Sequence, residues 1–349
     1  MSYNILGINT SHNGSVCILK DGKIDFFLEE ERISKDKADT FPIEIFKFLS
    51  KKYKIDEISI SGLGHLWRLK ELNLYKFTLG LLYPNIPIID YLGDHHLCHT
   101  LSSFYNSKFK KCLGVVIDGN GSYIPSSKDK LTAETESIFT LDYLNSPTCI
   151  YKFNRLLSAN EPLSLTKVYE SITISLGFEW DGAGKTMGLS SYGKPNFKIP
   201  SLYLNGKGNS LIFDNIFNST NGVLKEEYQY LVNSKDLSKD LAYKLQQESQ
   251  QAVGDLIEKT IKETGLKQIC CSGGYFLNCV ANYYLTKRFP KVDFYFEPIS
   301  SDAGVAIGAA KLAWYKKTQD KIINPQKTLY YGPKYTKKQL LKGIKKYLD

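Results

Sequence analysis

The chain has 349 residues, of which 42% are hydrophobic and 23% charged, so it is long enough to fold into two lobes with separate cores. Its net charge of +9 would suit a phosphorylated ligand or a nucleic acid, but the lysines are scattered and no basic run with interleaved aromatic residues precedes the tail. We therefore expect a solvated surface and no nucleic-acid partner. The seven cysteines form no CxxC pair. The chain shows neither a signal-like start nor an apolar window of about 18 residues, so we expect a cytoplasmic protein that spans no membrane.

Strands and helices alternate along the chain, which predicts an α/β fold. A turn of small polar residues, Thr10–Ser15, separates the first two strands, and Asp21-Gly22 predicts a hairpin after the second. The first turn would either wrap backbone N–H groups around an anion or simply reverse the chain. The predicted strands are 4–9, 16–19, 23–28, 58–61, 86–91, 112–118, 136–144, 149–154, 267–271 and 292–297, and the predicted helices are 41–52, 69–82, 165–176, 240–264, 279–288 and 305–315.

A faint internal repeat links two of these strands. Leu6-Gly7 and Leu113-Gly114 each lie in an apolar strand that runs into a polar turn containing glycine. The repeat suggests that the chain consists of two similar halves.

Three of the five histidines lie within five residues, in the segment Asp94-His95-His96-Leu97-Cys98-His99. On a helix, His95 and His99 would project from the same face one turn apart, and two such imidazoles make half of a metal site. The alternative is an ordinary helix start, capped by Asp94 and packed through Leu97 and Leu101. The metal interpretation needs further ligands from elsewhere in the chain.

Three other segments bear polar groups at the ends of predicted elements. Asp118 ends a strand beside two glycines, where α/β folds collect ligand groups, although a plain turn aspartate is the alternative. Asp302 precedes a helix of small residues that would let other backbone pack closely, and it could simply cap that helix. The strand, Gly-Gly turn and helix around Gly273 make a nucleotide or phosphate site plausible. The glycines of 180–189 do not have P-loop spacing and indicate only close backbone approach.

Six blocks of residues follow one another between about residue 5 and residue 335. They are Gly7-Ile8-Asn9-x-x-His12-x-x-Ser15 with Asp21-Gly22-Lys23-Ile24 and Glu29-Glu30-Glu31-Arg32; Asp94-His95-His96-x-x-His99; Asp118-Gly119-x-Gly121; Gly184-Lys185-x-Met187-Gly188-Leu189-x-x-Tyr192-Gly193; Ser272-Gly273-Gly274-x-x-Leu277-Asn278-Cys279; and Asp302-Ala303-Gly304-x-Ala306-x-Gly308-Ala309-Ala310. In this order they resemble the O-carbamoyltransferase family of nodulation-factor and antibiotic biosynthesis. Each block alone is weak, but six in sequence are specific.

The resemblance implies an α/β fold of the actin/Hsp70/sugar-kinase (ASKHA) type, with two lobes built on duplicated mixed sheets flanked by helices. We expect a first lobe over 1–120, a second lobe with variable insertions over 121–330, and the start of a C-terminal domain, otherwise absent, over 331–349. Family members typically make carbamoyl-adenylate from carbamoyl phosphate and ATP in a C-terminal YrdC-like domain. The actin-like domain then passes the carbamoyl group to a hydroxyl, with a divalent metal that is most often iron. Either a separate YrdC-like subunit would supply the adenylate here, or the chain is a truncated or split product.

The resemblance also implies roles for individual residues. The metal ligands are His95, His99, Asp118 and Asp302; the nucleotide-contacting residues are Gly273, Gly274 and Asn278; and Lys185 and Gly188 belong to a block that faces the ligand. His12 is the expected general base for the acceptor hydroxyl, with hydrogen bonding to the mixed anhydride as its rival role. The acceptor would be a hydroxyl of a sugar or small metabolite, and we expect segments 60–90 and 123–165 to shape its pocket. Two alternatives are a non-catalytic nucleotide-binding subunit and a nucleic-acid-modifying carbamoyltransferase.

Overall fold

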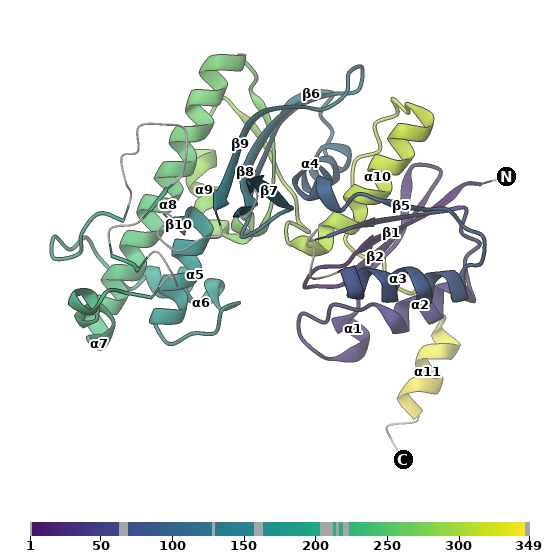
Figure 1. The fold of residues 1–349 in the computed structure, drawn as a ribbon, viewed down its shortest axis with the longest axis horizontal. Helices are drawn as coiled ribbons and strands as arrows, with labels where there is room; N and C mark the ends of the chain where they lie inside the picture. Colours follow the sequence, from purple (N-terminus) through teal and green to yellow (C-terminus); the bar gives the residue numbers. More distant parts are fainter. Residues whose placement is uncertain are drawn as a thin grey trace.

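The computed structural model describes residues 2–62, 69–127, 130–156, 163–202, 212–213, 216–218 and 223–345. Two mixed β-sheets lie side by side, with helices on their outer faces and two helices between them (Figure 1). The strands of the first sheet are β1 (Asn4–Asn9), β2 (Ser15–Lys20), β3 (Lys23–Glu29), β4 (Glu57–Ser61) and β5 (Ile88–Asp90). Those of the second are β6 (Lys111–Ile117), β7 (Tyr123–Ser127), β8 (Lys130–Asp142), β9 (Thr148–Leu156), β12 (Gln268–Ser272) and β13 (Asp293–Phe296), while β10 (Leu163–Ser164) pairs with β11 (Ile212–Phe213).

The helices are α1 (Glu31–Ser34), α2 (Ile43–Ser50), α3 (Leu69–Leu82), α4 (His95–Asn106), α5 (Leu165–Ser175), α6 (Ala183–Ser190), α7 (Tyr230–Asn233), α8 (Lys235–Thr264), α9 (Cys279–Arg288), α10 (Val305–Thr318) and α11 (Lys337–Lys345). Each of the six predicted helices is present, within a few residues of its predicted bounds, and α1, α4, α6 and α7 are additional. The prediction that the glycines of 180–189 lie close to other backbone is wrong for two of them. Gly184 and Gly188 lie in α6, and a Cβ added at either would meet nothing within 4 Å.

The two sheets repeat one topology. The first has the strand order β3-β2-β1-β4-β5 and the second β13-β12-β6-β8-β7, with β9 also paired to β8. In each sheet the first strand in the chain pairs antiparallel with one neighbour (β2 or β8) and parallel with the other (β4 or β12). Leu6-Gly7 lies in β1 and Leu113-Gly114 in β6, so the faint repeat does mark two similar halves.

Helices α4 and α10 lie between the sheets and pack against each other (Figure 1). Helix α4 follows the first sheet but packs on β6 and β12 of the second, whereas α10 follows the second sheet but packs on β1, β2 and β4 of the first. A Cβ on Gly308 of α10 would collide with the Cys98 carbonyl of α4, and a Cβ on Gly7 would collide with the Ala306 carbonyl. The predicted close packing of this small-residue helix is therefore confirmed.

The hydrophobic core has three parts because residues along each strand alternate between the two faces of a sheet. One part lies between the first sheet and helices α2 and α3, and another lies between the second sheet and helices α5, α8 and α9. The third fills the space between the sheets around α4 and α10. We call the first sheet with α1–α3 the first lobe, and the second sheet with α5–α9 the second lobe. The predicted boundaries between the lobes, at residues 120 and 330, stay predictions. The lobes are not continuous in sequence, because β6 belongs to the second sheet and α10 packs on the first.

After α10 the chain runs back along the first lobe. The backbone N–H of Phe27 in β3 donates to the carbonyl of Tyr331 at 3.2 Å. Helix α11 follows, where the sequence predicted a short basic helix, and none of its residues is buried. None of the helices in the described ranges is long and apolar enough to cross a membrane.

Candidate metal centre

The candidate centre lies at the carboxyl ends of β1 and β6, where α4 and α10 begin. Because the two halves repeat one topology, these two helices start at equivalent places, and their packing brings both starting points together. A cavity of about 640 Å³ opens at this point, between the lobes, and Asp118 and Asp302 are among its lining residues. Carboxyl ends of strands are where α/β sheets place their ligand groups.

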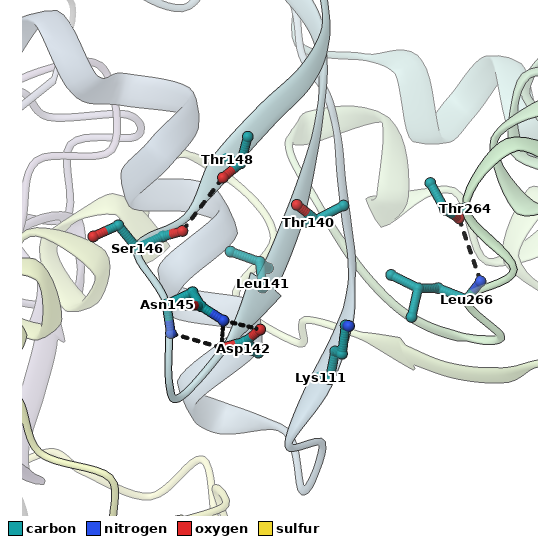
Figure 2. Close-up of a pocket in the computed structure, with 9 residues that line it drawn as sticks. All are labelled: Lys111, Thr140, Leu141, Asp142, Asn145, Ser146, Thr148, Thr264 and Leu266. Atoms are coloured by element: carbon teal, nitrogen blue, oxygen red, sulfur yellow. Dashed lines mark hydrogen bonds between the residues drawn. The ribbon is translucent and has the colours of Figure 1, made fainter.

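A second hollow of about 430 Å³ lies at the opposite end of β6 (Figure 2). Lys111 begins β6 and lines this hollow, whereas Asp118 follows the end of the strand, about 23 Å away at 3.3 Å per residue. The carboxylate of Asp142 accepts hydrogen bonds from the backbone and side chain of Asn145 in the same hairpin. The other residues that line this second hollow have hydroxyl or apolar side chains. The larger cavity is therefore the candidate site.

The structure brings the four predicted metal ligands together. His95, His99, Asp118 and Asp302 are all buried, and one ligand atom from each lies within 4.8 Å of the others. The Nε2 atoms of His95 and His99 are 3.1 Å apart, and His95 Nε2 lies 3.5 Å from Asp118 Oδ2. Asp302 Oδ1 lies 3.7 Å from His95 Nε2 and 3.6 Å from His99 Nε2.

These spacings fit a bound divalent metal. With bonds of about 2.1 Å, the ligand atoms of a tetrahedral site lie about 3.4 Å apart, close to the four distances above. The two imidazoles turn Nε2 atoms toward each other, and neither carboxylate pairs with a lysine or arginine in the described part of the chain. A divalent cation would suit this donor set.

The pKa values of the cluster show that the buried carboxyl groups are negatively charged and interact with the neighbouring imidazoles. Burial alone would raise the pKa of Asp118, but His95 and His99 hold it at about 2. The pKa of Asp302 likewise lies well below its usual range, because His12 and His95 outweigh its burial. Burial would lower the pKa of His95, but the Asp302 and Asp118 carboxylates raise it to about 10.

A second set of groups orients these side chains. Ser272 Oγ lies 3.2 Å from His99 Nδ1, the N–H of Gly274 donates to Asp118 at 2.9 Å, and the hydroxyl of Ser11 donates to Asp302 at 2.6 Å. Such outer contacts fix the orientation of metal ligands. The capping alternatives are not what the structure shows: Asp94 precedes α4 without a side-chain capping bond, and Asp302 lies in a 3-10 turn before α10.

His12 joins the centre through Asp302. Its Nδ1 lies 3.1 Å from Asp302 Oδ2, and the charge of Asp302 raises the pKa of His12. The Asn9 side chain holds the turn by donating to the carbonyls of His12 and Asn13 at 3.3 and 3.1 Å. Because Nδ1 faces Asp302, Nε2 is the imidazole nitrogen left for a ligand in the cavity, whose lining includes His12.

The predicted nucleotide turn also reaches the cavity. Gly273 has a φ of 95°, and a Cβ there would collide with the Ile117 carbonyl, so only glycine suits the position. Gly274 and Asn278 line the cavity. Asn278 additionally caps α9 by accepting from the N–H of Ala281 at 2.9 Å, and its side-chain N–H donates to Gln246 at 2.8 Å.

The predicted residues of α6 lie differently. The cavity lining contains Gly184 and Met187 of this helix but neither Lys185 nor Gly188. Lys185 Nζ instead lies 5.9 Å from the centre of the Phe178 ring. The ligand-facing roles of Lys185 and Gly188 stay predictions.

Sequence reasoning missed several residues of the cavity. Trp180, Glu29 and Arg32 line it, and Trp180 lies against His12 with ring centres 5.8 Å apart. Among the described residues, none from 60–90 or 123–165 contributes to the lining. In the sequence, the available signal was a tryptophan, Trp180, next to a run of glycines, because tryptophan is enriched at binding surfaces.

Comparison with known proteins decides the family. The model of the family described as Carbamoyltransferase N-terminus matches residues 83–311, which include all four residues of the candidate cluster. The chain belongs to this family. It is 25% identical to the uncharacterized protein sll1178 of Synechocystis over 97% of this chain and 63% of that protein. It is 22% identical to nodulation protein NolNO of Sinorhizobium fredii over 92% of this chain and 49% of that protein.

The chain spans about half the length of the curated relatives it matches. Among solved structures, full-length HypF in its phosphate- and nucleotide-bound form aligns with a TM-score of 0.55 and 16% identity, over 90% of this chain and 47% of that one. The activator of 2-hydroxyisocaproyl-CoA dehydratase from Clostridium difficile aligns with a TM-score of 0.50 and 13% identity, over 93% of this chain and 99% of that one. These likenesses concern the fold, and they confirm the predicted actin-like α/β architecture.

Proposed function

We propose that this chain is the transferase part of a metal-dependent O-carbamoyltransferase. It would move a carbamoyl group from carbamoyl-adenylate to a hydroxyl of a sugar or small metabolite. The observation that carries the proposal is the buried His95, His99, Asp118 and Asp302 cluster, which borders the interlobe cavity directly beside His12. Membership of the carbamoyltransferase N-terminal family and similarity to nodulation proteins support the reaction class.

The four cluster residues would hold a divalent metal, and we expect iron, because paired imidazoles with carboxylates suit Fe(II). When bound, the metal supplies Lewis acidity for a carbonyl or phosphate oxygen. Asp302 presents Oδ1 to the two histidines of the cluster and Oδ2 to His12 and Ser11. One carboxylate would thus serve the metal and the catalytic histidine together.

The adenylate would lie on the second-lobe side of the cavity. Gly273 and Gly274 bring backbone close to the cavity, and α9 begins immediately after this turn, with Asn278 as its cap. A helix N-terminus favours a phosphate because its free N–H groups and dipole are positive. The HypF structure is described as phosphate- and nucleotide-bound, which supports nucleotide binding as a property to test in this chain.

His12 would act on the acceptor. The acceptor oxygen attacks the carbamoyl carbon, the bond from that carbon to the phosphate oxygen breaks, and AMP leaves. The hydroxyl proton passes to Nε2 of His12, while Asp302 holds the ring through Nδ1. The rival role for His12 is hydrogen bonding to the mixed anhydride, and it predicts a weaker loss of transfer on substitution.

The adenylate itself would come from a YrdC-like partner or from chain that this sequence does not contain, as the greater length of the relatives suggests. A non-catalytic nucleotide-binding subunit and a nucleic-acid-modifying carbamoyltransferase are the two alternatives. Transfer by this chain when it is given carbamoyl-adenylate argues against the first. An absence of salt-sensitive RNA and DNA binding argues against the second.

The deciding experiment measures metal content and AMP binding of the purified chain. We expect stoichiometric divalent metal and AMP binding in the wild type, and loss of the metal when His95 and His99 are both replaced by alanine. His96→Gln is the matched control, since His96 lies on the same helix but its Nδ1 faces Ser137 Oγ at 2.8 Å outside the cluster. Unchanged metal content in the double variant would refute the site, and absence of both ligands from the wild type would refute the proposed function.

A further inference from the structure

Two contacts cross the cavity from the second lobe to the first. Lys37 Nζ lies 2.5 Å from Asp181 Oδ2, and the Trp180 ring packs against the His12 imidazole at 5.8 Å between centres, with the planes at 49°. Trp180 and Asp181 are neighbours in the turn before α6. Figure 1 shows α6 and α1 facing each other across the space between the lobes. We call these two contacts the interlobe bridge.

The first-lobe side of the bridge forms one supported unit. The N–H of Gly14, in the turn that contains His12, donates to the carbonyl of Asp39 at 2.6 Å. The N–H of Ala38 donates to the Glu31 carboxylate at 3.0 Å, and Ala38 has a φ of 60°, which few side chains adopt. These hydrogen bonds connect the loop that contains Lys37 to the turn that contains His12. A displacement of Lys37 would therefore also displace His12.

The second-lobe side is supported by α6. The N–H of Gly182 donates to the Glu179 carbonyl at 2.8 Å, which closes the turn that contains Trp180 and Asp181. Helix α6 packs against the long helix α8. The turn is therefore carried by the second lobe, and the two bridge contacts join it to the first lobe.

The bridge covers the part of the cavity that contains His12. Glu29, Glu31, Arg32 and Lys37 of the first lobe and Asp181 of the second lobe line the cavity together with His12. We infer that the interlobe bridge closes the acceptor side of the cavity, and that Trp180 is a positioning residue that holds the His12 imidazole and restricts which acceptors reach it. This inference rests on the proposed function and adds to it the residues that govern acceptor entry.

The bridge matters because water competes with the acceptor. If water attacks the carbamoyl carbon, the same carbon–oxygen bond breaks and AMP leaves, but the product is carbamate, which decomposes to carbon dioxide and ammonia. A closed bridge keeps bulk water from this carbon, and closing an active site is a general means of suppressing such hydrolysis. A displaced His12 would also serve the acceptor hydroxyl less well.

The bridge is weak enough to open in each cycle. The Lys37 side chain is 75% exposed and that of Asp181 21%, and exposed ion pairs shift an equilibrium by about two- to fivefold. Substitution of either charge should therefore increase the open fraction by about that factor without unfolding the chain. Trp180 is also half-exposed, so its removal leaves no cavity in the core.

The first test needs neither ligand nor activity. Hydrogen exchange of the amides in 178–182 is measured in the wild type and in Lys37→Asp. We expect exchange to be about two- to fivefold faster in the variant, because local opening sets the rate. Lys37→Asp combined with Asp181→Lys should restore protection, and Lys20→Asp, an exposed change at the end of β2, should leave it unchanged. Equal exchange in all four proteins would overturn the bridge.

The second test follows the fate of the carbamoyl group supplied as carbamoyl-adenylate with an accepted hydroxyl compound. Trp180→Ala should raise the ratio of hydrolysis to transfer by about tenfold and raise the acceptor KM, because the reacting groups lose their alignment. Trp180→Phe keeps a ring against His12 and should restore most of the wild-type ratio. An unchanged ratio in Trp180→Ala would overturn the positioning role. A wild-type chain that transfers nothing would count against the proposed function, and the exchange result would still decide the bridge.

Discussion

The contact between α4 and α10 gives the sharpest test of the fold, through Gly308→Ala. A methyl group at Gly308 would collide with backbone atoms of Cys98, including its carbonyl oxygen, and backbone cannot move aside as a flexible side chain can. Overpacking of this kind costs about 1–3 kcal/mol, and the collision with rigid backbone places it at about 3 kcal/mol. The helical preference of alanine over glycine offsets about 1 kcal/mol of this. We therefore expect a net loss of about 2 kcal/mol.

The assay is urea unfolding followed by circular dichroism, with the midpoint and slope compared between variants. Gly80→Ala in α3 is the matched control, because a Cβ there would meet nothing within 4 Å. This variant should be more stable than the wild type by about 0.5–1 kcal/mol. Gly308→Ala should also bind less metal, since α4 carries His95 and His99 while α10 follows Asp302. A Gly308→Ala chain as stable as the wild type would refute the close approach of the two helices.

Three further outcomes are expected. Burial raises the pKa of Glu297 from 4.5 to about 7, so the folded chain binds this proton more tightly than the unfolded chain, and the contribution to stability is full below pH 4.5 and is lost as the pH rises to 7. Glu297→Gln should raise the free energy of unfolding at pH 8 by about 3 kcal/mol and leave it nearly unchanged at pH 4. The control Glu263→Gln, at a half-exposed side chain, should not raise the free energy of unfolding at pH 8. Equal gains for Glu297→Gln at both pH values would contradict the raised pKa of Glu297. Phe104→Ala should cost about 3–5 kcal/mol in urea unfolding, because this buried ring packs against the Tyr143 ring at 4.9 Å between centres, and a loss under 1 kcal/mol would count against that packing. Metal at 100 times its Kd should raise the free energy of unfolding by about 2.7 kcal/mol, as followed by thermal melts with and without chelator, and His95→Ala should abolish the response.

The sequence determined most elements of this protein because the forces that set them are local. Short apolar runs predicted the central strands, helical spacing predicted α8, and Asp21-Gly22 predicted the first tight hairpin, where both residues adopt positive φ. The spacing of His95 and His99 placed both imidazoles on one helix face. The order of six short blocks was sufficient to identify the family and thereby the fold.

Tertiary structure alone decided how the two halves exchange helices. No local pattern shows that α4 crosses to the second sheet and α10 to the first, because that arrangement depends on which surfaces pack best once both sheets exist. This exchange brings Asp302 to His95, residues that lie far apart in the chain. The residues alone allowed a turn aspartate at 118 and a cap at 302, and only packing could distinguish these from a shared cluster.

The same limit explains why the predictions for α6 differ from the cavity lining. Lys185 and Gly188 belong to a block that resembles the family, yet Gly184 and Met187 face the cavity, because the rotation of a helix is set by what its other face packs against, here α8. Trp180 and Asp181 meet His12 and Lys37 only because the lobes approach each other at that point. Contacts between residues far apart in the chain have no periodic signature in sequence, since they arise from the fit of whole surfaces.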